Sequence, residues 1–202
     1  MSNSGAIKQQ LVLSLTLLPI TFALWYAAGA LFAAPSAWVA SQLLPLLWPS
    51  IIIETGFDQT VFFVITDFGI LDNTIVAAEQ VGSEIVVEAN TRLLSYSVPF
   101  YAALIWGAKL EDSFERFARG LLVLWFFMLL GLLSMIAKDL MLVIGEPYLR
   151  QTALPPSAIA LCYQFSVLLM PSLVPVALWL WQLRDTPLWH GFAAQLSDHS
   201  RH

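Results

Sequence analysis

Charged residues are scarce in this chain. Only 11% of its 202 residues are Asp, Glu, Lys or Arg, whereas 58% are hydrophobic. A soluble domain carries about 25% charged residues, so this chain has too few to cover a surface that faces water. The apolar excess predicts a mainly α-helical membrane protein in contact with lipid. The formal net charge of −5 also argues against nucleic acid as a partner, since phosphate binding needs clustered Lys and Arg.

Cysteine and histidine are scarce as well. Cys162 is the single cysteine, which excludes an intrachain disulfide and a cysteine-based metal site. A cysteine nucleophile needs a neighbouring base. The three histidines, His190, His199 and His202, all lie in the C-terminal tail, which we expect on the other side of the membrane from Cys162. We therefore interpret Cys162 as a small packing residue, and an enzyme that uses it is a rival hypothesis.

Familiar catalytic motifs are absent too. The chain has no HExxH, GxSxG, P-loop or GxGxxG pattern, each of which would place reactive groups at a defined spacing. The sequence therefore predicts no catalytic residues, no metal site, no cofactor and no small-molecule substrate.

What the chain does have is long apolar stretches. A membrane-spanning helix needs about 20 predominantly apolar residues, and four stretches predict such helices: residues 11–32, 93–110, 121–144 and 158–183. The first exceeds the roughly 7–15 apolar residues of a signal-peptide core. The second is the shortest, and it requires a locally thinner bilayer or surrounding protein. We expect one membrane domain over residues 1–202, with a polar cytoplasmic tail at 184–202.

Between the first two spans the sequence changes character. Residues 36–48 form a short apolar stretch with Trp38 and Trp48 near its ends, which favours a helix lying along the membrane interface. A re-entrant hairpin is the alternative. Residues 51–92 then alternate apolar with polar residues and are rich in β-branched and aromatic types, which predicts a small antiparallel sheet. We expect a hairpin connection at 56–59 and another turn at Asp72-Asn73.

Basic residues predict the orientation. If both termini are cytoplasmic, the inner segments hold Lys8, Lys109, Arg116, Arg119, Arg184 and Arg201. The outer segments then hold only Arg92 and Arg150. This bias agrees with the positive-inside rule. It places the β segment, with its many carboxylates, on the outer side of the membrane.

Two sets of polar residues are candidate contacts for a partner. Glu84, Glu88, Asn90 and Arg92 fall on one face of a predicted strand, and Tyr96 follows at the start of the second span. A solvated strand face is the simpler interpretation of the first four.

The other set is Lys138 and Asp139, the charged residues within a span. Intramembrane charges are candidates for function. Since neighbouring residues on a helix point about 100° apart, we expect each to need its own partner. Structural pairing is favoured here over contact with a partner or substrate.

Three stretches resemble a known family. They are Leu17-Leu18-Pro19 through Leu24-Trp25-Tyr26, then APSAWVASQLLPLLWP, and then EANTRLLSYSVPFYAALIWG over Glu88–Gly107. Their order resembles the exosortase H-associated membrane proteins of Gram-negative bacteria. The resemblance implies a role beside an exosortase, an intramembrane cysteine transpeptidase that processes C-terminal sorting signals. Such an enzyme would carry Cys, Arg and His at one outer-facing site, and this chain lacks that set.

The leading hypothesis is therefore a non-enzymatic accessory protein of the inner membrane. Its outer β segment would contact the sortase or its substrate. The rival from another class is a small transporter or channel subunit that uses Lys138 and Asp139 and a proline-broken fourth span.

Overall fold

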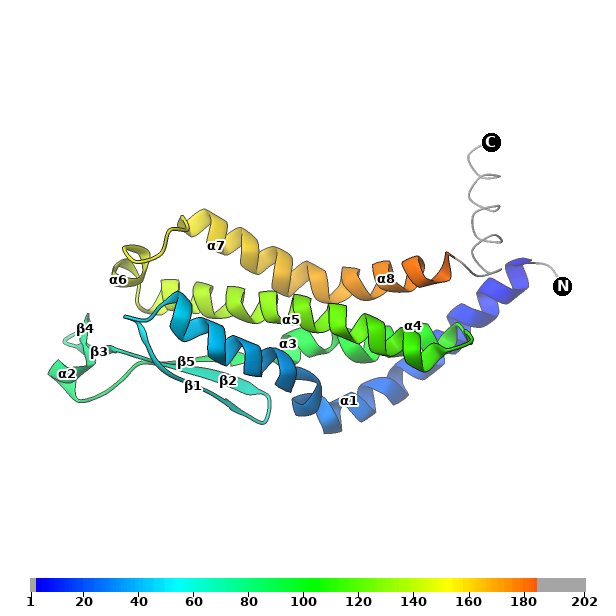
Figure 1. The fold of residues 1–202 in the computed structure, drawn as a ribbon, viewed down its shortest axis with the longest axis horizontal. Helices are drawn as coiled ribbons and strands as arrows, with labels where there is room; N and C mark the ends of the chain where they lie inside the picture. The colour runs from blue at the N-terminus through cyan, green and yellow to red at the C-terminus, as the bar shows by residue number, and fades with distance from the viewer. Residues whose placement is uncertain (1–2, 185–202) are drawn as a thin grey trace. The chain divides into compact units, whose positions relative to one another are not determined.

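The fold is mainly helical (Figure 1) in a computed structural model, which describes residues 3–184 of the chain and their side chains from residue 9 onward. The long helices are α1 (Asn3–Leu47), α5 (Ser113–Val143) and a helix made of α7 (Pro156–Tyr163), the π-helix η1 (Gln164–Leu169) and α8 (Met170–Leu183). The shorter helices are α2 (Ala78–Val81), α3 (Arg92–Ser95), α4 (Ser97–Gly107) and α6 (Glu146–Leu149). The strands are β1 (Ile52–Asp58), β2 (Val61–Thr66), β3 (Phe68–Leu71), β4 (Thr74–Ala77) and β5 (Val86–Asn90).

The chain divides into two units that are each built from separate segments. The first unit contains residues 1–27, 96–124 and 172–202, and the second contains residues 28–95 and 125–171. Three helices, α1, α5 and the one formed by α7, η1 and α8, therefore begin in one unit and end in the other. All strands belong to the second unit.

Helix α1 is continuous where we expected two helices. The predicted break between a span at 11–32 and an interfacial helix at 36–48 is missing, because α1 continues through Pro35 to Leu47. Alanines on both sides of Pro35 favour helix, and in lipid an unpaired backbone costs more than one lost hydrogen bond. A re-entrant hairpin at 36–48 is thereby wrong. The placement of this stretch at the membrane interface stays a prediction.

The second predicted span, residues 93–110, is not one long helix. It consists of α3, then Tyr96, then α4 with 11 residues. At about 1.5 Å per residue, α4 alone falls well short of the roughly 30 Å hydrocarbon core. Asn90 helps to end the strand before it, since the Arg92 backbone N–H donates to Asn90 Oδ1 at 3.0 Å. The carbonyl of the next residue, Thr91, accepts the first helical bond of α3, from the Ser95 N–H at 3.0 Å.

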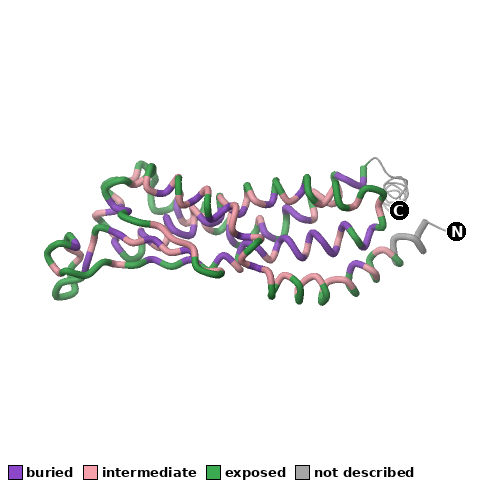
Figure 2. The backbone as a smooth tube through the Cα atoms, turned by 60° about the horizontal axis from the view of Figure 1, so that its bottom comes forward, coloured by how far each residue is buried: buried purple, intermediate pink, exposed green. Residues whose placement is uncertain are grey.

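Three helices in the described part of the chain are long and apolar enough to cross a membrane. They cover Gln9–Leu47, Ser113–Val143 and Pro156–Leu183. Exposed positions recur along the helical part of the chain (Figure 2). On the three helices they include large apolar residues, for example Leu15 at 64%, Phe126 at 57% and Leu168 at 58%. Such exposure suits lipid as the surrounding solvent. The mainly helical membrane fold is confirmed, while a count of four spans is not.

The third helix widens into a π turn just before a proline. Residues 164–169 adopt the π form, and Pro171 and Pro175 follow. A proline ring clashes with the carbonyl of the preceding turn in an ordinary α-helix. The wider π turn gives that ring room, which explains a local distortion without a break in the helix.

The sheet has the predicted antiparallel character. β2 is the central strand of β1-β2-β5, and β3 and β4 form a separate hairpin. Asp72 and Asn73, both with positive φ, make the β3–β4 turn, as predicted. The other hairpin turns later than expected, at Gln59-Thr60, because Gly56 lies within β1 opposite Phe63. A Cβ at Gly56 would lie 2.2 Å from the Phe63 ring, so glycine is needed there to leave room for the ring.

Small residues on the second half of α1 allow close packing in the second unit. Ala33, Ala37, Ala40 and Leu44 form a buried stripe at helical spacing. Beside it, Ser36 Oγ donates to the Trp125 carbonyl at 2.9 Å, and Trp125 Nε1 donates to the Phe32 carbonyl at 2.9 Å. These two hydrogen bonds connect α1 to α5.

The turn after α5 packs on the end of α1. The rings of Trp48 and Tyr148 lie 5.5 Å apart, and Ser50 donates a hydrogen bond to Gln151. Tyr148 is fully buried, and burial raises the pKa of its hydroxyl to about 12. The side chain therefore stays neutral at physiological pH.

Candidate functional site

The outer face of the three-stranded sheet carries two of the predicted contact residues. Glu88 and Asn90 are exposed on β5, while Val87 and Ala89 between them are buried. The alternation predicted for this strand is thus confirmed. Glu84 is also exposed but precedes the strand, and Arg92 follows it in α3.

Strand register shows what surrounds Glu88. Phe63 is its partner on β2, and Gly56 of β1 pairs with Phe63 in turn. The same face holds the carboxylates of Glu54 and Asp58 on β1, and the apolar side chains of Val61, Ile65 and Val86. We call this set, with Phe63 and Glu88, the outer face. No Lys or Arg occurs in these three strands, so the face combines an apolar centre with acidic edges.

Tyr96 lies in the first unit. Its hydroxyl is 2.9 Å from Ser172 Oγ. Both residues line an apolar cavity of about 460 Å³, together with Leu18, Pro19, Phe22 and Phe100. The hydroxyl pair is the polar feature of an otherwise apolar pocket.

Lys138 and Asp139 pair with each other. Lys138 Nζ lies 2.6 Å from Asp139 Oδ1, and it also lies 4.7 Å from the centre of the Tyr163 ring. The expectation that each charge needs a separate partner was wrong. The long lysine side chain folds back around the helix to its neighbour, which a comparison of Cβ directions alone does not reveal.

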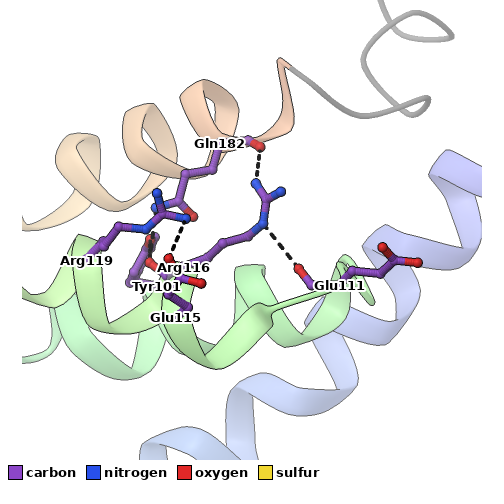
Figure 3. Close-up of polar contacts among 6 residues, drawn as sticks. All are labelled: Tyr101, Glu111, Glu115, Arg116, Arg119 and Gln182. Atoms are coloured by element: carbon purple, nitrogen blue, oxygen red, sulfur yellow. Dashed lines mark hydrogen bonds and ion pairs between the residues drawn. The ribbon is translucent and has the colours of Figure 1, made fainter.

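The structure reveals a polar cluster that sequence reasoning missed. In the first unit, Tyr101 Oη and Gln182 Nε2 both donate to the Arg116 carbonyl, at 3.1 Å each (Figure 3). In return, Arg116 Nη1 donates to the Gln182 carbonyl at 2.7 Å. Gly120 lets the Tyr101 ring approach α5, since a Cβ there would lie 2.1 Å from Tyr101 Oη. In the sequence, the signal for this cluster was the grouping of arginines at the ends of the predicted spans. That grouping was used only to predict the orientation of the chain in the membrane.

Among residues 3–184, no three His, Cys, Asp or Glu side chains gather closely enough to hold a metal ion. Cys162 is exposed on α7. The burial that a packing residue would show is therefore not seen at this position. The three histidines lie outside the described residues.

Comparison with known proteins gives one match. A family model described as exosortase H-associated membrane protein matches residues 4–186. No curated protein and no solved structure matches the chain. The match covers both units and all three long helices. The chain is therefore a member of the exosortase H-associated membrane protein family.

Proposed function

We propose that this protein is a non-catalytic accessory of an exosortase in the bacterial inner membrane, and that it contacts the sortase or its substrate through the outer face. The family description supports association with an exosortase. On the predicted four-span topology, the positive-inside bias of the sequence supports cytoplasmic termini and a periplasmic sheet.

The observation that carries the proposal is the composition of the outer face. Val86, on the edge strand β5, is half exposed, and Phe63 stands at the centre, paired in register with Gly56 and Glu88. Exposed apolar area with an aromatic residue at its centre and charges around it is typical of protein interfaces. The carboxylates of Glu54, Asp58 and Glu88 fit a partner surface that presents Lys or Arg.

The rival transport function loses its main support. Lys138 and Asp139 form an ion pair with each other at 2.6 Å, so each charge is already compensated and neither favours the binding of a transported ion. We therefore retain the accessory function alone.

Neutralising the outer face should weaken the association. We expect Glu54→Gln, Asp58→Asn and Glu88→Gln together to reduce the amount of exosortase recovered with the protein by about tenfold, since three rim charges each contribute up to about 1 kcal/mol. The measurement is quantitative co-purification of the tagged full chain from native membranes at low salt.

A matched triple variant controls for net charge. Asp72→Asn, Glu79→Gln and Glu84→Gln remove the same charge from residues that lie outside the three-stranded sheet. Full recovery is expected with this variant. Equal loss in both triples would refute the outer face as the contact. Repeated recovery of the wild-type chain without any exosortase would refute the accessory function itself.

A further inference from the structure

A basic cavity of about 350 Å³ lies in the first unit, lined by Arg116, Arg119, Trp181, Gln182 and Arg184. Arg116 and Arg119 stand in the first turns of α5, and Trp181 and Gln182 in the last turn of α8. The helix α5 and the helix Pro156–Leu183, of which α8 is the last part, are both long and apolar enough to cross a membrane. The ends of such helices lie at the depth of the lipid headgroups.

Among the described residues, the Arg116 guanidinium is held in place by neutral acceptors. Its Nε donates to the Glu111 carbonyl at 3.2 Å and its Nη1 donates to the Gln182 carbonyl at 2.7 Å (Figure 3). Both acceptors are neutral, and a guanidinium has five N–H donors, so charge and donors remain for a ligand. Arg119 shares its charge with Glu115 at 3.6 Å. None of the described lining residues is a carboxylate.

Gln182 supplies an independent sign of a missing ligand. The residue is only 7% exposed, and its Nε2 is used on the Arg116 carbonyl. Its Oε1 is buried and has no hydrogen-bond partner among the described residues. A buried acceptor left unpaired costs free energy, so a ligand that brings a donor would be favoured here.

We propose that this cavity binds the headgroup of a phospholipid. The phosphodiester would lie against Arg116, Arg119 and Arg184, and a headgroup hydroxyl or ammonium would donate to Gln182 Oε1. Trp181, 60% exposed, is the type of residue that occupies the headgroup region beside lipid. Basic pockets between helices at the cytoplasmic surface recognise lipid headgroups by this chemistry.

Lipid binding to the full chain in detergent tests the proposal. Native mass spectrometry with added phosphatidylglycerol should give a dissociation constant that rises about fivefold in Arg119→Gln and in Arg184→Gln, and about 25-fold in the double variant. Arg116 is left unchanged, because its hydrogen bonds also join α5 to α8. Arg150→Gln is the control, since Arg150 pairs with Glu146 outside this cavity, and its affinity should equal that of the wild type.

Two further ligands separate the phosphate from the lipid. Diacylglycerol, which lacks the phosphate, should bind at least tenfold more weakly than phosphatidylglycerol, and inorganic phosphate should not compete at equal concentration. Equal affinity of the double variant and the wild type, or diacylglycerol bound as tightly as phosphatidylglycerol, would overturn the proposal. Effective competition by inorganic phosphate would overturn the assignment to a lipid. None of these outcomes depends on the exosortase, so they test the cavity separately from the outer face.

Discussion

Gly107→Ala is expected to lower the stability of the first unit by about 1–3 kcal/mol, the usual cost of overpacking. A Cβ at Gly107 would lie 2.1 Å from Ser14 Oγ and 2.8 Å from Ser14 Cα. Because Ser14 Cα belongs to the backbone of α1, the clash cannot be relieved by a rotamer change alone. Thermal unfolding in detergent, followed by tryptophan fluorescence, should show a midpoint lower by about 2–12 °C.

Two companion variants identify the cause. Ser14→Gly removes the Oγ and Cβ that crowd the site, so it should recover part of the loss when combined with Gly107→Ala, which a double-mutant cycle measures directly. Gly131→Ala in α5 should cost less, because its closest neighbour is the flexible end of Leu94 at 2.5 Å. An unchanged midpoint for Gly107→Ala, with no coupling to Ser14, would contradict this packing of α1 on α4.

Asp139→Asn should also destabilise the protein, by about 2–3 kcal/mol. The substitution removes the carboxylate at 2.6 Å from the Lys138 ammonium, which keeps the Tyr163 ring at 4.7 Å as its neighbour. Breaking a fully buried pair costs about 3–5 kcal/mol, and here the two side chains are 25% and 23% exposed, so a smaller loss is expected. Reversible unfolding in mixed micelles gives the measurement.

The double variant Lys138→Met, Asp139→Leu distinguishes pairing from partner contact. Replacement of both charges by apolar groups is often neutral, so its stability should be close to that of the wild type. Its recovery with exosortase should also be unchanged. A stable double variant that loses its partner would assign the pair to the interface. A double variant as unstable as Asp139→Asn would show that pairing is not what the two residues contribute.

Local signals predicted the sheet well because they act over a few residues. Asp72-Asn73 tolerates positive φ at both positions, and the alternation around Glu88 sets which side chains are buried in β5. The hairpin turn was misplaced because Gly56 has two uses. Glycine favours turns, but here it makes room for Phe63, a partner whose register is decided by the whole strand pair.

Long-range features could not be predicted in the same way. A proline such as Pro35 would end a helix in most local contexts. Here α1 continues past it, and the next residue, Ser36, donates a hydrogen bond to α5. The Arg116–Gln182 bonds join residues that are 66 apart in sequence. Nothing in the spacing of either residue indicates the other, and only the folded chain brings them together.

The discontinuity of the two units has a consequence for biogenesis. The second unit needs residues 125–171 in addition to its strands, and the first draws its last segment from residues 172–202. During synthesis from the N-terminus, neither unit can be complete while the ribosome is still translating α7. The β1–β2 hairpin can form early, because its partners are close in sequence and Thr55 Oγ1 donates to the Ser41 carbonyl of the preceding helix α1, whereas residues 125–171 of the same unit are made later. Both units therefore become complete only after α7 has been made.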